Sequence, residues 1–216
     1  MTKPGDSINT LLFDWDGTLN DSAASGFTAF EKSLAELGVR FTLEFYEANY
    51  TPNWYRMYEV LNLPPEEWER ADQLWLHHYG DAPVTLVEGA RETLRELERR
   101  GYRLGIVTSG SQARIARELD QTGLGGAFRA VVCNEHIVNK KPHPEGLEHA
   151  MRLMKAEPSA CSYVGDAPDD ILMGKSAQVL TVGVKSFYPS SKHLAGASPD
   201  IHLNSITELL LHFDGI

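Results

Sequence analysis

The chain has 216 residues, of which 42% are hydrophobic, so it can form one domain with an insertion or two small domains. Its formal net charge of −10 argues against nucleic acid or an anionic membrane surface as a partner. The sequence predicts neither a membrane span nor a signal peptide, and Cys133 and Cys161 lie in apolar runs without metal or redox spacing. We therefore expect a cytoplasmic protein, a monomer or a homodimer, with reduced cysteines in its core.

The first predicted strand, residues 9–14, ends in an acidic motif. Asp14 and Asp16 flank Trp15, and Gly17 can then turn the chain out of the strand. Because side chains alternate along an extended backbone, the two carboxylates point the same way. A divalent metal would relieve their repulsion, since hard cations take oxygen ligands. The alternative is an Asp-Gly turn that only ends the strand.

Residues 21–82 are predicted to form a helical insert, because no strand-like run occurs among them. The expected helices cover residues 24–37, 43–61 and 65–79. The joints to the rest of the chain are predicted at residues 20–22 and 81–84. The chain is thereby divided into a core domain, residues 1–20 and 83–216, and a smaller helical domain, residues 21–82.

Strands and amphipathic helices alternate over the rest of the chain. The further strands are expected at residues 102–108, 129–133, 161–165, 179–184 and 200–203. The helices are expected at residues 90–100, 111–121, 145–155 and 206–213, and Ser205 and Glu208 form a capping box for the last one. This alternation predicts an α/β fold with a doubly wound parallel sheet. Such sheets bind ligands at the carboxyl ends of their strands, where Thr108 and Asp166 join the acidic motif.

Four motifs, in this order, resemble the signatures of the haloacid dehalogenase-like superfamily. They are Asp14-Trp15-Asp16-Gly17-Thr18-Leu19, then Leu104 to Thr108 followed by Ser109-Gly110, then Lys141-Pro142, and finally Val164-Gly165-Asp166 with Asp170. The resemblance spans residues 8 to about 185. The helical insert is similar to the small cap of the phosphoglycolate-phosphatase-like branch, which implies a Rossmann-like core and an enzyme. Dehalogenases of the superfamily lack the second aspartate of the first motif, so Asp16 favours phosphate chemistry.

The resemblance implies catalytic roles for Asp14, Asp16, Thr108 and Lys141. Asp14 would be the nucleophile that forms an aspartyl phosphate. Asp16 would be the general acid and then the general base, which requires it to be protonated while Asp14 is ionised. Lys141, rather than Lys140, takes the family role because a proline follows it.

A magnesium ion is also implied by the resemblance. It would be held by Asp14, the backbone carbonyl of Asp16 and Asp166. Asp170 would either bind the ion through a water molecule or hold Lys141 in position.

The phosphate group would be bound by Thr108, Ser109, Gly110 and Lys141. The first three join a strand to a helix N-terminus, whose free N–H groups favour anions. The alternative is that Ser109 or Ser111 is simply a helix cap.

The substrate is predicted less directly. Arg56 could contact a carboxylate or a second anion of the substrate, or could be a surface residue. The motifs predict a magnesium-dependent phosphomonoester hydrolase acting on a small phosphorylated metabolite, phosphoglycolate-like or a sugar phosphate, with no nucleic-acid or membrane partner. A sugar-phosphate mutase of the same superfamily and a non-catalytic phosphate-binding module are the alternatives.

Overall fold

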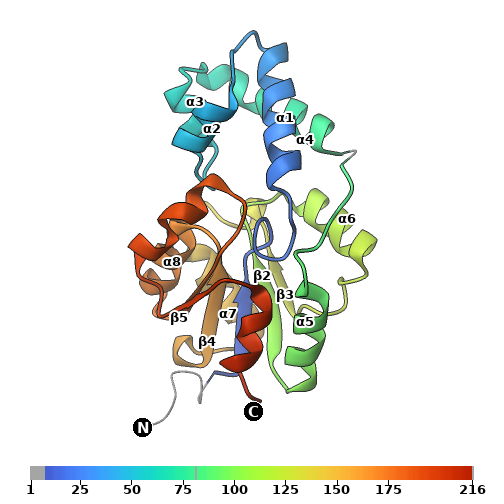
Figure 1. The fold of residues 1–216 in the computed structure, drawn as a ribbon, viewed down its shortest axis with the longest axis vertical. Helices are drawn as coiled ribbons and strands as arrows, with labels where there is room; N and C mark the ends of the chain where they lie inside the picture. Colours follow the sequence, from blue (N-terminus) through green and yellow to red (C-terminus); the bar gives the residue numbers. More distant parts are fainter. Residues whose placement is uncertain (1–7, 81, 216) are drawn as a thin grey trace.

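A six-stranded parallel sheet forms the centre of the protein in the computed structural model, which describes residues 8–80 and 82–215 (Figure 1). The strands are β1 (Thr10–Phe13), β2 (Arg103–Val107), β3 (Ala130–Val132), β4 (Cys161–Gly165), β5 (Leu180–Val184) and β6 (Ile201–Leu203). Their order in the sheet is β3-β2-β1-β4-β5-β6, and every neighbouring pair is parallel. The predicted α/β fold is confirmed, and each strand begins and ends within about one residue of its predicted position.

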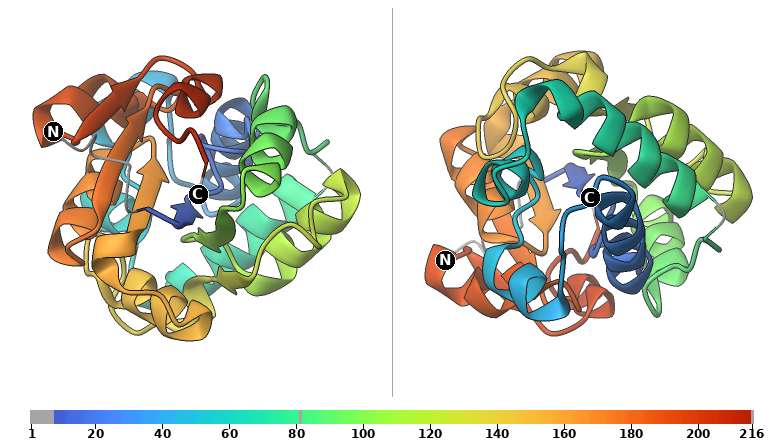
Figure 2. Two further views of the ribbon diagram at one scale, coloured as in Figure 1. Left: turned by 90° about the horizontal axis from the view of Figure 1, so that it is seen from below. Right: turned by 90° about the horizontal axis from the view of Figure 1, so that it is seen from above.

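Helices cover both faces of the sheet, as Figure 2 shows. They are α5 (Ala90–Arg99), α6 (Gln112–Thr122), α7 (Glu145–Met154) and α8 (Pro168–Ser176). Leu11 and Phe13 of β1 pack with α5 and α6, whereas Leu12 between them packs with α7 and α8. This alternation follows from the two-residue period of a strand, and burial on both faces explains why β1 is apolar throughout.

Shorter 3₁₀ helices occur in the connections: η1 (Pro65–Glu67), η2 (Asn134–His136), η3 (Pro158–Ala160), η4 (Pro189–Ala197) and η5 (Ile206–Leu211). The prediction of a last α-helix was wrong in type, because η5 is closed by tighter i to i+3 bonds. The predicted capping box is only half formed. Ser205 accepts a hydrogen bond from the Thr207 N–H, but Glu208 accepts from Asn204 rather than from Ser205.

The helical insert consists of α1 (Ala23–Glu36), α2 (Leu43–Asn49), α3 (Tyr55–Val60) and α4 (Trp68–Gly80). It has its own apolar core, which includes Leu34 and Met57, and it lies beyond the carboxyl ends of the strands (Figure 1). The single helix predicted at residues 43–61 was wrong, because the chain leaves the helix between α2 and α3. Pro52 lies in that break, where it lacks an N–H group and disfavours helical backbone at the preceding residue.

The two connections to the insert pair with each other. The Asp21 N–H donates to the Thr85 carbonyl at 2.7 Å, and the Val87 N–H donates to the Leu19 carbonyl at 2.9 Å. Asp81, in the second predicted joint, lies outside the described residues. The insert is thus attached to the sheet by two adjacent, hydrogen-bonded segments.

Two further expectations concern the whole chain. Cys133 and Cys161 are buried and unbridged, so their placement in the core is confirmed. Within residues 8–80 and 82–215, every helix is too short or too polar to span a lipid bilayer.

Candidate active site

The central strands bring the acidic motifs to one edge of the sheet. Phe13, the last residue of β1, is in register with Ile106 of β2 and Val164 of β4. Asp14 therefore emerges beside the residues that follow those two strands, Thr108 and Asp166. Strand order reverses between β1 and β4, and ligands bind at such a point in open α/β sheets.

Lys141 links the first and fourth motifs. Its Nζ lies 2.6 Å from Asp14 Oδ1 and 2.7 Å from Asp170 Oδ1, and all three side chains are buried. Asp170 Oδ2 in turn accepts hydrogen bonds from the backbone N–H groups of Asp166 and Ala167. Burial alone would lower the pKa of Lys141, but Asp14 and Asp170 outweigh it and raise the pKa well above its usual value. Lys141 is therefore a fixed positive charge beside Asp14.

Three of these carboxyl groups form a set that fits a divalent cation. One oxygen from each of Asp14, Asp166 and Asp170 lies within 4.8 Å of the others. Burial raises the pKa of Asp166 well above its usual value, and the charges of Asp170 and Asp14 raise it further. Gly17 has φ of +84°, and a Cβ at this position would lie 2.5 Å from Asp166 Oδ2. A hard cation bound between these buried carboxylates would relieve the electrostatic repulsion among them.

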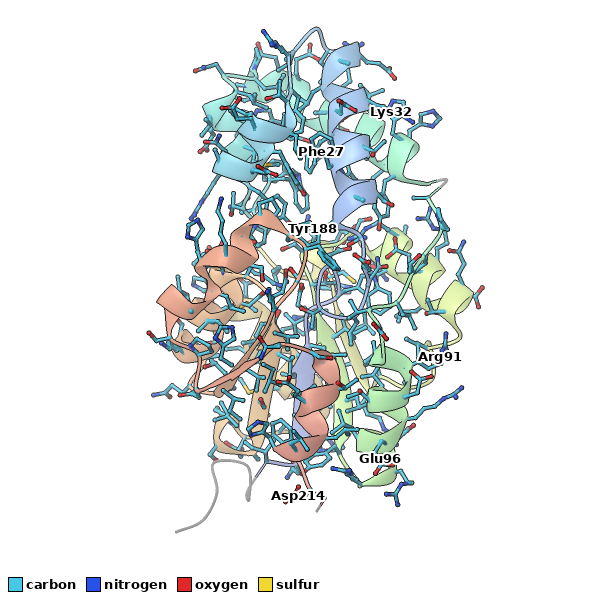
Figure 3. The ribbon with its side chains drawn as sticks, viewed as in Figure 1. Phe27, Lys32, Arg91, Glu96, Tyr188 and Asp214 are labelled. Carbon is cyan, nitrogen blue, oxygen red and sulfur yellow. The ribbon has the colours of Figure 1, made fainter. Side chains whose placement is uncertain are left out.

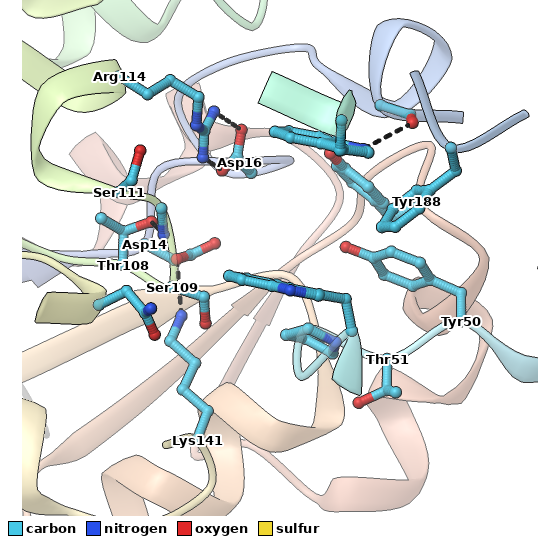
Figure 4. A pocket seen from close by; sticks show the side chains of 18 of the residues that line it. Asp14, Asp16, Tyr50, Thr51, Thr108, Ser109, Ser111, Arg114, Lys141 and Tyr188 are labelled. Carbon is cyan, nitrogen blue, oxygen red and sulfur yellow. Dashed lines mark hydrogen bonds and ion pairs between the residues drawn. The ribbon is translucent and has the colours of Figure 1, made fainter. Parts of the chain in front are cut away.

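Asp16 is bound by an arginine that the sequence analysis missed. Arg114 of α6 contacts both carboxylate oxygens, with Nη1 3.0 Å from Oδ1 (Figure 4). Ser22 Oγ also donates to Oδ1, at 2.7 Å. The Arg114 guanidinium is buried under the rings of Trp75 and Tyr79, at 5.7 and 5.1 Å. Arg114 of the core and Ser22 of the insert therefore hold the Asp16 carboxylate in one orientation.

The surroundings of the two aspartates act on their pKa values in opposite directions. Burial raises the pKa of Asp14 to about 7, although the charge of Lys141 opposes it. Burial would also raise the pKa of Asp16, but the charge of Arg114 and the hydrogen bonds from Arg114 and Ser22 outweigh it and lower the pKa. A protonated Asp16 beside an ionised Asp14 therefore stays a prediction for the enzyme with metal and substrate bound, and it requires the contacts of Arg114 with Asp16 to loosen.

Arg114 itself is anchored by a second buried charge. Glu118, one turn later on α6, is fully buried and lies 3.3 Å from Arg114 Nη1. Trp15, between the two aspartates, donates its Nε1–H to Glu118 Oε2 at 2.7 Å. The sequence did contain a signal for this buried pair, because Arg114 and Glu118 are four residues apart and lie beside apolar residues of α6.

The strand-to-helix turn after β2 carries three of the residues predicted to bind phosphate, Thr108, Ser109 and Gly110. Thr108 Oγ1 accepts a hydrogen bond from the Gly110 N–H at 3.1 Å. Ser111, not Ser109, is the N-cap residue of α6, and the Glu135 carboxylate accepts the Gln112 N–H at 2.9 Å in place of a serine cap. The Ser109 side chain is thus not committed to a helix cap.

A cavity of about 260 Å³ lies between this edge of the sheet and the insert (Figure 4). The predicted site residues in its wall are Asp14, Asp16, Thr108, Ser109, Gly110, Lys141 and Asp166. The insert contributes mainly aromatic side chains, namely Phe30, Tyr46, Tyr50, Trp54, Tyr58 and Trp75. The predicted core residues therefore come together in one enclosed site, with Asp170 behind them.

Arg56 is placed differently from the other predicted site residues. Its side chain is exposed, and it is not among the described residues that line the cavity. Its charge acts instead on Asp169, where burial raises the pKa and Arg56 opposes the rise. Asp169 is half-buried and accepts a hydrogen bond from Thr51 of the insert at 3.3 Å.

The loop after β5 also reaches the site and was missed by the motif analysis. Ser186 Oγ donates to Asp166 Oδ2 at 2.6 Å, and the Tyr188 hydroxyl lies 2.9 Å from Ser22 Oγ. Tyr188 stacks on Tyr50 with ring centroids 4.9 Å apart, and it lies where the insert meets the core (Figure 3). These residues follow the last motif, and only their position at a strand's carboxyl end could have identified them.

Comparison with known proteins defines the class of this chain. A family model for haloacid dehalogenase-like hydrolases matches residues 11–184. The chain belongs to the haloacid dehalogenase-like hydrolase family, and it is an enzyme of that family, as the four motifs predicted.

Individual proteins are similar over almost the full chain. Pyrophosphatase PpaX of Anoxybacillus flavithermus is 32% identical over 219 residues, covering 94% of this chain and 96% of that protein. Pyrophosphatase PpaX of Listeria welshimeri is 35% identical over 207 residues, covering 94% and 95%. The crystal structure of a predicted phosphoglycolate phosphatase from Haemophilus somnus superposes with a TM-score of 0.83 at 21% identity, covering 95% of this chain and 97% of that one. The fold is thus that of phosphatases in this family.

Proposed function

We propose that the chain is a magnesium-dependent phosphomonoester hydrolase that acts on a small phosphorylated metabolite through an aspartyl phosphate on Asp14. The observation that carries this proposal is the position of Asp14. Its carboxylate lines the cavity, lies 2.6 Å from the Lys141 ammonium and belongs to the cluster of buried carboxylates with Asp166. Membership of a hydrolase family and similarity to pyrophosphatases support the same reaction class.

The reaction would proceed in two displacements at phosphorus. An oxygen of Asp14 attacks the phosphorus and the ester oxygen leaves with its electron pair, taking a proton from Asp16. Asp16 then accepts a proton from water as that water attacks the phosphorus and releases Asp14. Such acid–base assistance typically contributes about 10²–10⁴-fold to a rate.

Several groups would stabilise the charge on the transferring phosphoryl group. Lys141 neutralises negative charge beside Asp14, while Thr108, Ser109 and Gly110 offer hydrogen bonds at the start of α6. Asp14, Asp166 and the backbone carbonyl of Asp16 would hold magnesium. When bound, the ion would neutralise phosphate charge and favour the ionised form of Asp14.

Arg114 would control the position of Asp16. Asp16 can donate a proton only after it has gained one, so its contacts with Arg114 must loosen during the reaction. We expect the phosphate of the substrate to compete for the Arg114 guanidinium, since arginine binds phosphate and carboxylate groups with similar geometry.

Residues 21–82 would act as a cap over this chemistry. The paired segments at Asp21–Thr85 and Leu19–Val87 would be the hinges, and closure would exclude bulk water from the aspartyl phosphate.

The test is release of phosphate from p-nitrophenyl phosphate by the purified chain. We expect multiple turnovers with magnesium and loss of activity after chelation, restored when magnesium is added back. Activity that survives complete chelation would overturn the metal dependence. Phosphate binding without turnover would indicate a non-catalytic module, and transfer to a sugar acceptor would indicate a mutase.

A further inference from the structure

The wall that the described residues of the insert contribute to the cavity is mainly aromatic and carries no positive charge. Its rings come from Phe30, Tyr46, Tyr50, Trp54, Tyr58 and Trp75. Asp72 of α4 is the one charged side chain that the insert's described residues place in this wall. The leaving group of a substrate would therefore meet ring faces and a carboxylate.

The two cations in the wall belong to the core and are already paired. Arg114 contacts Asp16 and Glu118, and Lys141 contacts Asp14 and Asp170. Among the described lining residues, five acidic side chains accompany these two cations. A bound divalent ion would favour the ionised forms of Asp14 and Asp166, and its charge would cancel that of a phosphate dianion, so the excess negative charge of the wall would act on the rest of the substrate.

Asp72 is held in place by aromatic side chains of the insert. Its Oδ1 accepts hydrogen bonds from Trp54 Nε1 at 2.9 Å and from the Tyr58 hydroxyl at 3.1 Å, and its Oδ2 accepts from the Tyr55 hydroxyl at 2.9 Å. These bonds fix the carboxylate and the rings together as one surface. The buried Tyr46 hydroxyl, also in the wall, has no hydrogen-bond partner among the described residues. Burial raises the pKa of Asp72, and the hydrogen bonds from the two tyrosines and Trp54 oppose the rise. The surface thus offers π-faces, a carboxylate held in one orientation and a free hydroxyl.

We propose that the substrate is the phosphomonoester of an amino alcohol, whose alkylammonium group lies against these rings near Asp72. Aromatic rings and a carboxylate are the groups that recognise an ammonium ion, by attraction to the negative ring faces and to the carboxylate charge. A second anion, as in phosphoglycolate or pyrophosphate, would instead face Asp72 without a free cation. This inference rests on the proposed phosphatase function and narrows its substrate class.

The test compares three esters with magnesium present: choline phosphate, its uncharged isostere 3,3-dimethylbutyl phosphate, and phosphoglycolate. The isostere keeps the shape of choline and replaces its nitrogen by carbon, so the ratio of kcat/KM isolates the positive charge. We expect choline phosphate to exceed the isostere by about tenfold, which lies between the values of an exposed and of a desolvated cation–π contact, and phosphoglycolate to be the poorest of the three. Equal values for choline phosphate and the isostere, or a preference for phosphoglycolate, would overturn the inference.

Two variants test whether the preference for choline phosphate depends on Asp72. Asp72→Asn should bring the choline-to-isostere ratio down towards one, whereas Glu69→Gln, an exposed carboxylate three residues earlier on α4, should leave it unchanged. An unchanged ratio in Asp72→Asn would contradict the role of that carboxylate.

Hydrolysis of p-nitrophenyl phosphate by the wild-type chain distinguishes failure of the proposed phosphatase function from failure of the proposed substrate class. If that ester is not hydrolysed, the phosphatase function itself fails, and if it is hydrolysed without a preference for choline phosphate, only the substrate class fails.

Discussion

Replacing Glu118 by glutamine tests the buried network behind Asp16. The substitution keeps the volume of the side chain but removes a negative charge that is fully buried. Arg114, 3.3 Å away, would lose one of its two carboxylate partners, and the Trp15 indole would lose a charged acceptor at 2.7 Å. Breaking a buried pair costs about 3–5 kcal/mol, and Arg114 keeps Asp16, so we expect a loss of about 3 kcal/mol in the free energy of unfolding.

Urea unfolding at neutral pH measures this loss. The midpoint should fall while the denaturant slope stays the same, because the native surface is unchanged. Asp120→Asn is the matched control, since Asp120 is an exposed carboxylate on the same helix, and it should change stability by no more than about 0.5 kcal/mol. A loss below about 1 kcal/mol for Glu118→Gln would refute the reasoning, because it would show that the buried charge is not coupled to Arg114.

Three further predictions concern the metal cluster and the insert. Because burial raises the pKa of Asp14 to about 7, a metal ion must displace a proton from this site at lower pH. Magnesium affinity, measured by calorimetry between about pH 5.5 and 8, should weaken by up to tenfold for each unit below pH 7, and a flat profile would contradict this. Gly17→Ala should weaken magnesium binding, because the new Cβ would displace Asp166. Gly38→Ala is the control: it has a similar φ of +72° and open space around it, so it should carry the same backbone strain and leave magnesium affinity unchanged. Since Arg56 is exposed and is not among the described lining residues, Arg56→Ala should leave KM unchanged for both phosphoglycolate and p-nitrophenyl phosphate; a rise confined to phosphoglycolate would restore its predicted role as an anion contact.

The core of the fold was predictable because its strands are short and apolar and end at polar motifs. β1 is buried on both faces, so its sequence carries a plain signal. The insert was less predictable, since its segments are uniformly helical in character and a single proline, Pro52, decides where α2 and α3 separate.

The sequence predicted which residues lie in the site where they belong to a motif. It missed residues that reach the site through the packing of helices and loops. Asp14 and Lys141 meet because the ends of parallel strands share one edge, which the sequence order already implies. Arg114 reaches Asp16 through the packing of α6, and Tyr188 arrives from a loop beyond the last motif. The pKa order of the two aspartates depends on those contacts, and no local pattern could supply it.

Mass spectrometry of acid-quenched enzyme during turnover tests the central claim most directly. Rapid quenching of the chain with magnesium and substrate should trap one phosphoryl group on the peptide that contains Asp14, and fragmentation should place it on Asp14 rather than on Asp16. Asp14→Asn, which lacks the nucleophile and whose folding is checked by circular dichroism, should show neither the adduct nor phosphate release. Turnover by Asp14→Asn at a near-normal rate, or an adduct on another residue, would contradict the account.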